Sequence, residues 1–175
     1  MFQRKTFREC TNELSFHSRE FRDAYFDTTM DKQKRDAKFK STSENGLEIL
    51  DKLALAIRRG DDYGNIQVPD HLFIGKVLSK LTFEEAKQNR DLYHGSGPNS
   101  LLKFENLNLR GILNKIAHYN PFQSSYYLTP NLHELVLVGE SRSPRADGYW
   151  IAILDIDKLN AAINELPDIS LESKG

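Results

Sequence analysis

The sequence has little that would link it to a membrane, to secretion or to a disulfide framework. Cys10 is its only cysteine, so an intrachain disulfide is impossible. The longest apolar runs, such as residues 149–154, are far shorter than the roughly 18 residues that span a bilayer. The first ten residues mix charged and aromatic side chains where a signal peptide would be apolar. We therefore expect a cytoplasmic protein that makes no contact with a membrane.

The sequence also lacks an excess of charge of either sign. Its 24 Lys and Arg residues oppose 25 Asp and Glu residues, which leaves a formal net charge of -1 and a pI near 6.5. Binding to nucleic acid would therefore need a local basic patch, and the basic stretch at residues 30–43 is more typical of a solvated face or a mobile connector. Five dispersed histidines and one cysteine show no metal-ligand spacing, so no metal site is expected.

The first half of the chain predicts helices. One or two solvated helices are expected within residues 1–40, and apolar residues at helical intervals predict another over residues 44–59. Pro69 can open a helix over residues 69–81, and the capping-box pair Thr82 and Glu85 predicts a further one that ends near residue 89. With 175 residues and 39% hydrophobic content, we expect a helical region at residues 1–90 and a second unit at residues 91–175.

The second half predicts a small sheet. Turn-forming residues follow Tyr93, which predicts a short strand over residues 91–93, and Pro98 can open a helix up to residue 106. Residues 131–140 are ambiguous by periodicity, and Asn131 after Pro130 favours a helix there. The remaining segments are expected to be a strand at residues 126–129, a strand at residues 149–156 and a helix at residues 158–166. The predicted fold class is α+β.

Four segments in this order resemble the ADP-ribosyltransferase superfamily: YHGS at residues 93–96, YYLT at residues 126–129, the block that follows it, and YWIAILDID at residues 149–157. The resemblance covers about residues 91–160. It implies a small split sheet around a cleft that binds NAD as a substrate.

The resemblance also implies a role for particular residues. His94 would hydrogen-bond the ribose on the adenosine side, Gly95 would offer its backbone to the nicotinamide amide, and Ser96 would supply the hydroxyl of the motif. Tyr127 would pack its ring on the nicotinamide, while Tyr126 would point to the opposite face of the strand. On this interpretation His94 and Tyr127 carry the reaction.

The reaction that the resemblance implies needs one more group, a carboxylate. Cleavage of the bond between nicotinamide and ribose passes through an oxocarbenium-like state, and a carboxylate usually binds the ribose hydroxyl and orients the nucleophile. The family carries that carboxylate on a later strand, whereas this sequence ends nine residues after Leu166. Glu172 is the residue that could take its place. Asp155 and Asp157 fit better as caps of the last helix.

The expected function is therefore transfer of ADP-ribose from NAD to a protein or nucleic-acid acceptor, which is a glycosyltransferase reaction. A toxin or effector delivered to a host cytoplasm is one kind of protein that would carry it out. The tRNA 2'-phosphotransferases share the fold, and Arg142 and Arg145 could meet a phosphate on that interpretation. LNKIAHY at residues 113–119 resembles the HEPN ribonuclease signature, with Leu113 where the arginine stands and His118 as the histidine. A non-enzymatic helical interaction module is the remaining alternative.

Overall fold

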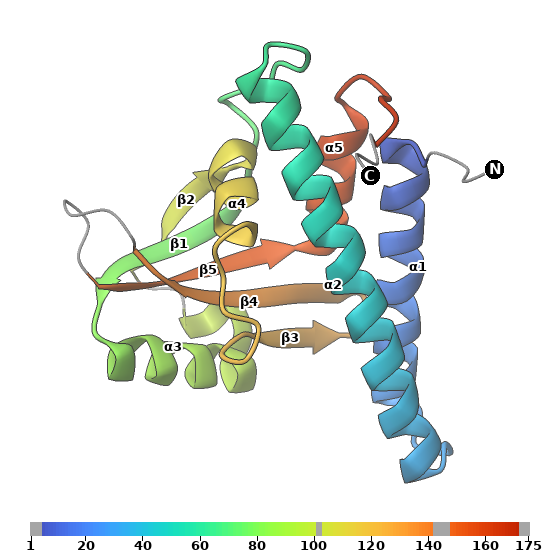
Figure 1. The fold of residues 1–175 in the computed structure, drawn as a ribbon. Helices are drawn as coiled ribbons and strands as arrows, with labels where there is room; N and C mark the ends of the chain where they lie inside the picture. Colours follow the sequence, from blue (N-terminus) through green and yellow to red (C-terminus); the bar gives the residue numbers. More distant parts are fainter. Residues whose placement is uncertain (1–4, 101–102, 142–147, 172–175) are drawn as a thin grey trace.

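The computed structural model describes residues 5–100, 103–141 and 148–171, and it shows one antiparallel sheet with helices on both faces (Figure 1). This architecture confirms the predicted α+β class. The described helices are α1 Phe7–Phe26, α2 Lys32–Asp62, α3 Phe83–Ser96, α4 Leu109–Ile116 and α5 Ile156–Asn164. The described strands are β1 Phe73–Leu81, β2 Glu105–Asn108, β3 Ser125–Thr129, β4 Leu132–Glu140 and β5 Tyr149–Asp155.

The sheet is continuous, in the order β2-β1-β5-β4-β3, and every neighbouring pair is antiparallel. This differs from the split sheet that the family resemblance implies. Strand β5 occupies the centre, and residues 150–155 are buried on both faces, as their apolar run predicts. Because β1 precedes residue 90 and pairs with β5, the sheet joins the two halves of the chain.

Two hydrophobic cores lie on the two faces of the sheet. The larger core joins α1, α2, α4 and α5 to the side chains of Leu137, Trp150, Ala152 and Leu154. The smaller core packs α3, through Ala86 and Tyr93, against the opposite face of β4 and β5. Alternation along the strands therefore decides which residues face the long helices and which face α3.

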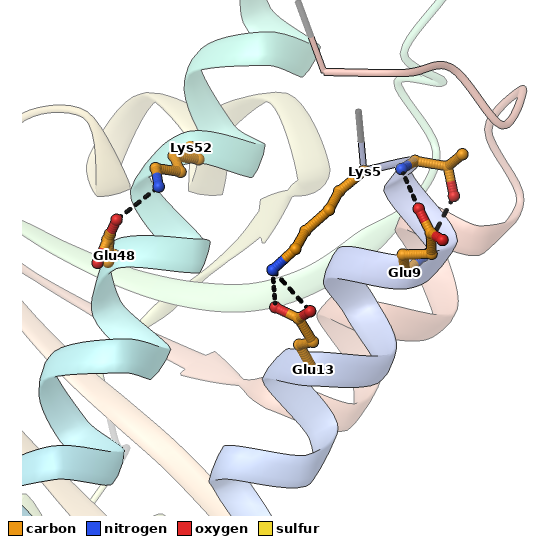
Figure 2. Close-up of polar contacts among 6 residues, drawn as sticks. Lys5, Glu9, Glu13, Glu48 and Lys52 are labelled. Atoms are coloured by element: carbon orange, nitrogen blue, oxygen red, sulfur yellow. Dashed lines mark hydrogen bonds and ion pairs between the residues drawn. The ribbon is translucent and has the colours of Figure 1, made fainter. Parts of the chain in front are cut away.

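Helices α1 and α2 run side by side along one end of the sheet (Figure 1). Thr6 and Glu9 form a capping box at the start of α1, and Asp31 caps α2 by accepting from two backbone amides. Figure 2 shows the capping box together with two ion pairs, Lys5 with Glu13 and Lys52 with Glu48. These ion pairs are exposed, and such pairs typically contribute only about 0–1 kcal/mol. The apolar contacts between the helices therefore matter more.

The structure corrects several sequence predictions in the first half. Residues 69–81, predicted as a helix, contain β1, because pairing with β2 and β5 outweighs the helical spacing of their apolar side chains. For residues 30–43 the sequence favours a mobile connector and a packed element equally, and from Lys32 onward the structure has the packed element, the first turns of α2. The helices predicted within residues 1–40 and over residues 44–59 are confirmed as α1 and the later part of α2.

The second half brings both corrections and confirmations. The strand predicted at residues 91–93 is wrong, because α3 continues to Ser96 and the turn comes at Gly97, whose φ is 58°. The helix predicted at residues 99–106 is replaced by a short 3-10 turn, Gly97–Ser100, and by β2. The helix predicted at residues 131–140 is strand β4. Strands β3 and β5 and helix α5 confirm the other three predictions.

Alanine substitutions at two glycines test this fold, because they should change its stability in opposite directions. A Cβ atom at Gly75 in β1 would lie 2.6 Å from the backbone oxygen of Ile153 and 2.5 Å from Ile112 Cδ1. We expect Gly75→Ala to lower the free energy of unfolding by about 1–3 kcal/mol through overpacking. A Cβ atom at Gly95 would meet nothing within 4 Å. Because Gly95 lies in a helix, Gly95→Ala should raise the stability by up to about 1 kcal/mol. Urea unfolding measures both, and a destabilising Gly95→Ala would contradict the helical assignment.

Candidate ligand-binding pocket

The predicted motif residues His94, Gly95 and Ser96 lie on the last turn of α3 and are exposed. His94 Nδ1 lies 2.6 Å from the backbone oxygen of Tyr126. A carbonyl oxygen can only accept a hydrogen bond, so Nδ1 carries the proton and donates it. Arg90 makes a similar contact, donating from Nη1 to the backbone oxygen of Gln123 at 3.1 Å. These side chains therefore cap backbone carbonyls along the edge of the sheet at β3.

Tyr127 lies on the face of β3 that α3 covers, opposite to the face of Tyr126. It does not meet His94 across a described pocket. Its ring packs on Gly97, where a Cβ atom would lie 2.3 Å from Tyr127 Cζ, and on Tyr93 at 5.9 Å between centroids. The tyrosine beside His94 is Tyr126, with its ring centroid 5.0 Å away. Of the two, Tyr126 and not Tyr127 lines a described pocket. Glu172, Arg142 and Arg145 lie outside the described residues.

A pocket of about 390 Å³ opens between α1, α2 and the face of β3 and β4 that these helices cover. The segment between α4 and β3 closes one side of it through Tyr119, Pro121 and Ser124. Aliphatic side chains form its base: Leu14, Leu47, Leu50, Leu135, Leu137 and Ile156. Figure 1 shows the elements that supply this lining, with α1 and α2 beside strands β3 and β4. It is mainly apolar and of the size typical of small-molecule sites.

Aromatic rings form the other end of the pocket. Phe21 of α1 packs on Phe39 of α2 with 5.1 Å between centroids, and its edge-to-face contact with Tyr126 of β3 is also 5.1 Å. His133 of β4 stacks nearly parallel to Phe21 at 5.3 Å. Three elements far apart in the sequence thus supply one aromatic wall. Such rings offer flat apolar surfaces against which a ligand can pack.

Polar side chains also contribute to the lining, and one pair of them has a fixed geometry. The Nδ1 atom of His133, a residue only 8% exposed, lies 2.9 Å from Ser18 Oγ. Burial, together with the positive charge of Arg22, lowers the pKa of His133 to about 4, although a hydrogen bond with the Ser18 backbone opposes this. The imidazole is therefore neutral at pH 7. Its Nε2 atom and the Nδ1 atom of His17 are buried without a hydrogen-bond partner in the described part of the chain.

Other clusters are less suited to hold a ligand. A second pocket of about 410 Å³ lies beside the start of α4, where Arg110 pairs with Asp61 at 3.3 Å, and its lining is largely charged and amide side chains. Tyr93 donates to Glu134 Oε2 at 2.5 Å on the α3 face. Burial raises the pKa of both groups, and the contact fastens α3 to β4. Neither cluster combines an apolar cavity with converging polar groups.

The signature resembling HEPN ribonucleases is divided by the end of a helix. Helix α4 ends at Ile116 with Ala117 as its C-cap, so His118 follows the helix and is exposed. Arg110 lies on the first turn of α4 and pairs with Asp61 of α2. Lys115 packs over the Trp150 ring at 4.2 Å. The segment thus contributes to packing between α2, α4 and the sheet.

Comparisons with protein-family models, with curated proteins and with solved structures found no match. Of the helices in the described ranges, none is both long and apolar enough to cross a bilayer. Within the same ranges, no group of three or more His, Cys, Asp or Glu side chains is placed to hold a metal ion. Support for a function therefore comes from the geometry of the pocket.

Sequence reasoning missed the pocket because it assigned residues 131–140 to a helix. In a strand, His133 shares a face with Leu135 and Leu137, and a histidine in line with buried leucines indicates a polar group inside an apolar layer. That alternation was the available signal. Ser18 gave no signal of its own, because its role depends on α1 packing across β4.

The depressed pKa of His133 predicts how acid affects stability. The unfolded chain takes up this proton near pH 6.5, whereas the folded chain takes it up near pH 4. Between these values the unfolded state binds more protons than the folded state. The free energy of unfolding is therefore highest above pH 6.5 and falls as the pH is lowered to about 4. The total loss that His133 causes is on the order of 3 kcal/mol.

Urea unfolding of the wild type and of His133→Leu at pH 7 and pH 4.5 tests this expectation. The wild type should lose more stability than the variant over this interval, because the variant has no imidazole to titrate. Equal losses in the two proteins would show that the buried imidazole does not govern this response.

Proposed function

We propose that this protein binds a small, mainly apolar molecule in the pocket between α1, α2 and the sheet. The observation that carries the proposal is the pocket itself, about 390 Å³ with an aliphatic base and an aromatic wall. Protein interiors are normally close-packed, and voids larger than a water molecule are few. Leu47 and Leu135 of the lining are only partly buried, and an apolar ligand would cover their exposed surface.

The polar groups support binding more than catalysis. Ser18 and His133 have the spacing of a nucleophile and its base, with 2.9 Å between Oγ and Nδ1. A general base works best when its pKa is near the working pH, and the pKa of His133 is about 4. The Nε2 atom also has no carboxylate to orient it among the described residues. The pair therefore fixes a neutral imidazole in the wall, where it shapes the site.

Binding of neutral apolar probes tests the proposal. Full-length protein should bind decan-1-ol or 2-naphthol with saturable chemical-shift changes in NMR spectra. Ser43 lines the pocket on α2, so Ser43→Phe should fill the space and weaken binding at least tenfold. Ser41→Phe places the same ring on an exposed position of the same helix and should leave the affinity unchanged. Absence of saturable binding, or equal affinities in both variants, would contradict a ligand site here.

Transfer of ADP-ribose from NAD stays a prediction from the sequence resemblance. On that prediction NAD raises the melting temperature of the wild type, and His94→Ala removes the increase while Ser43→Phe retains it. The reverse pattern would place NAD in the pocket between α1 and α2. No change in melting temperature with NAD in any of the three proteins would count against the resemblance.

A further inference from the structure

The mouth of the pocket carries one positive charge beside one hydroxyl group. Lys40 and Ser43 both line the pocket from α2, and residues three positions apart are neighbours on a helix surface. Lys40 is exposed and forms no ion pair with another described residue. The side-chain hydroxyl of Ser43 likewise makes no hydrogen bond within the described ranges. Both groups are thus free to bind a ligand.

No carboxylate from the described residues balances this charge in the pocket lining. Glu20 of α1 pairs with Lys38 at 2.6 Å, and Asp51 of α2 bonds the Tyr119 hydroxyl, so both carboxylates already have partners. The Nε atom of Arg22, one residue beyond Phe21, is also buried without a partner in the part of the chain that the structure describes. Lys40 is the only lysine, arginine or carboxylate side chain in the described lining, so its charge favours an anion.

The positive and apolar ends of the site lie apart. Lys40 neighbours Phe39 on the N-terminal half of α2, whereas Leu47 and Leu50 follow two to three turns later and face the buried base. A ligand that satisfies both ends has a polar head and an apolar body. The exposed position of Lys40 lets its ammonium group keep water while it binds the head.

From this arrangement we propose that the ligand is a hydrophobic carboxylate, with its carboxylate bound by Lys40 and Ser43 and its apolar body directed toward the leucines at the base. The inference rests on the proposed function and adds the chemical class of the ligand. A carboxylate accepts hydrogen bonds from both the ammonium and the hydroxyl group. Exposed ion pairs contribute little to affinity, so the acid should bind roughly threefold to fivefold tighter than its neutral alcohol.

Calorimetric titration with matched pairs tests the inference: decanoate against decan-1-ol, and 2-naphthoate against 2-naphthol, each below its aggregation limit at pH 7. The wild type should prefer the acid of at least one pair by about threefold or more. Lys40→Gln should abolish that preference, with a larger loss of affinity for the acid than for the alcohol. Lys34→Gln removes a charge from an exposed position of the same helix outside the pocket lining, and it should retain the preference.

The outcomes separate the two proposals. If none of the four probes binds, the proposed function itself is contradicted. Equal affinity for acid and alcohol leaves the pocket as a ligand site and overturns the carboxylate inference. A preference for the acid that survives in Lys40→Gln, or is lost equally in Lys34→Gln, also overturns the inference, because a general charge effect would then explain it.

Discussion

The alternation of side chains along β4 is the constraint on which the rest of the structure depends. Its residues 133, 135 and 137 face α1 and α2, whereas residues 134, 136 and 138 face α3. The first set provides the pocket with one of its two histidines and two of its leucines. The second set holds α3 against the sheet through Tyr93 and Glu134. A shift of one residue in the register would exchange the two faces and remove both the pocket and the smaller core.

The two helical layers do not pack equally closely on the sheet. Helix α3 packs closely, with Tyr93 fully buried and Tyr127 pressed against Gly97. Helices α1 and α2 pack closely near Leu50 and Leu53, but they leave a cavity where the aromatic rings of Phe21 and Phe39 approach β3. The two helical layers therefore differ: α3 covers its face of the sheet closely, whereas α1 and α2 leave space for a ligand at their aromatic end.

Parts of this fold could be predicted from the sequence, and the reasons for the failures are physical. A dense run of β-branched and aromatic residues predicts the β5 strand, and helical periodicity predicts the later part of α2. The β1 strand could not be predicted in this way, because its apolar spacing also fits a helix and only its pairing with β5 and β2 makes it a strand. The α3 helix continues through His94 because Gly97, and not Gly95, takes the positive φ that ends it. For the site, residue types were visible in the sequence, but the meeting of Ser18 with His133 depends on tertiary packing.

The most direct test of this account is a measurement of intermolecular nuclear Overhauser effects between bound decan-1-ol and methyl groups of strand β4. The account predicts contacts from the alkyl chain to the methyl groups of Leu135 and Leu137, which face α1 and α2. It predicts none to Val136 and Val138, which face α3. Contacts to the valines without contacts to the leucines would contradict it.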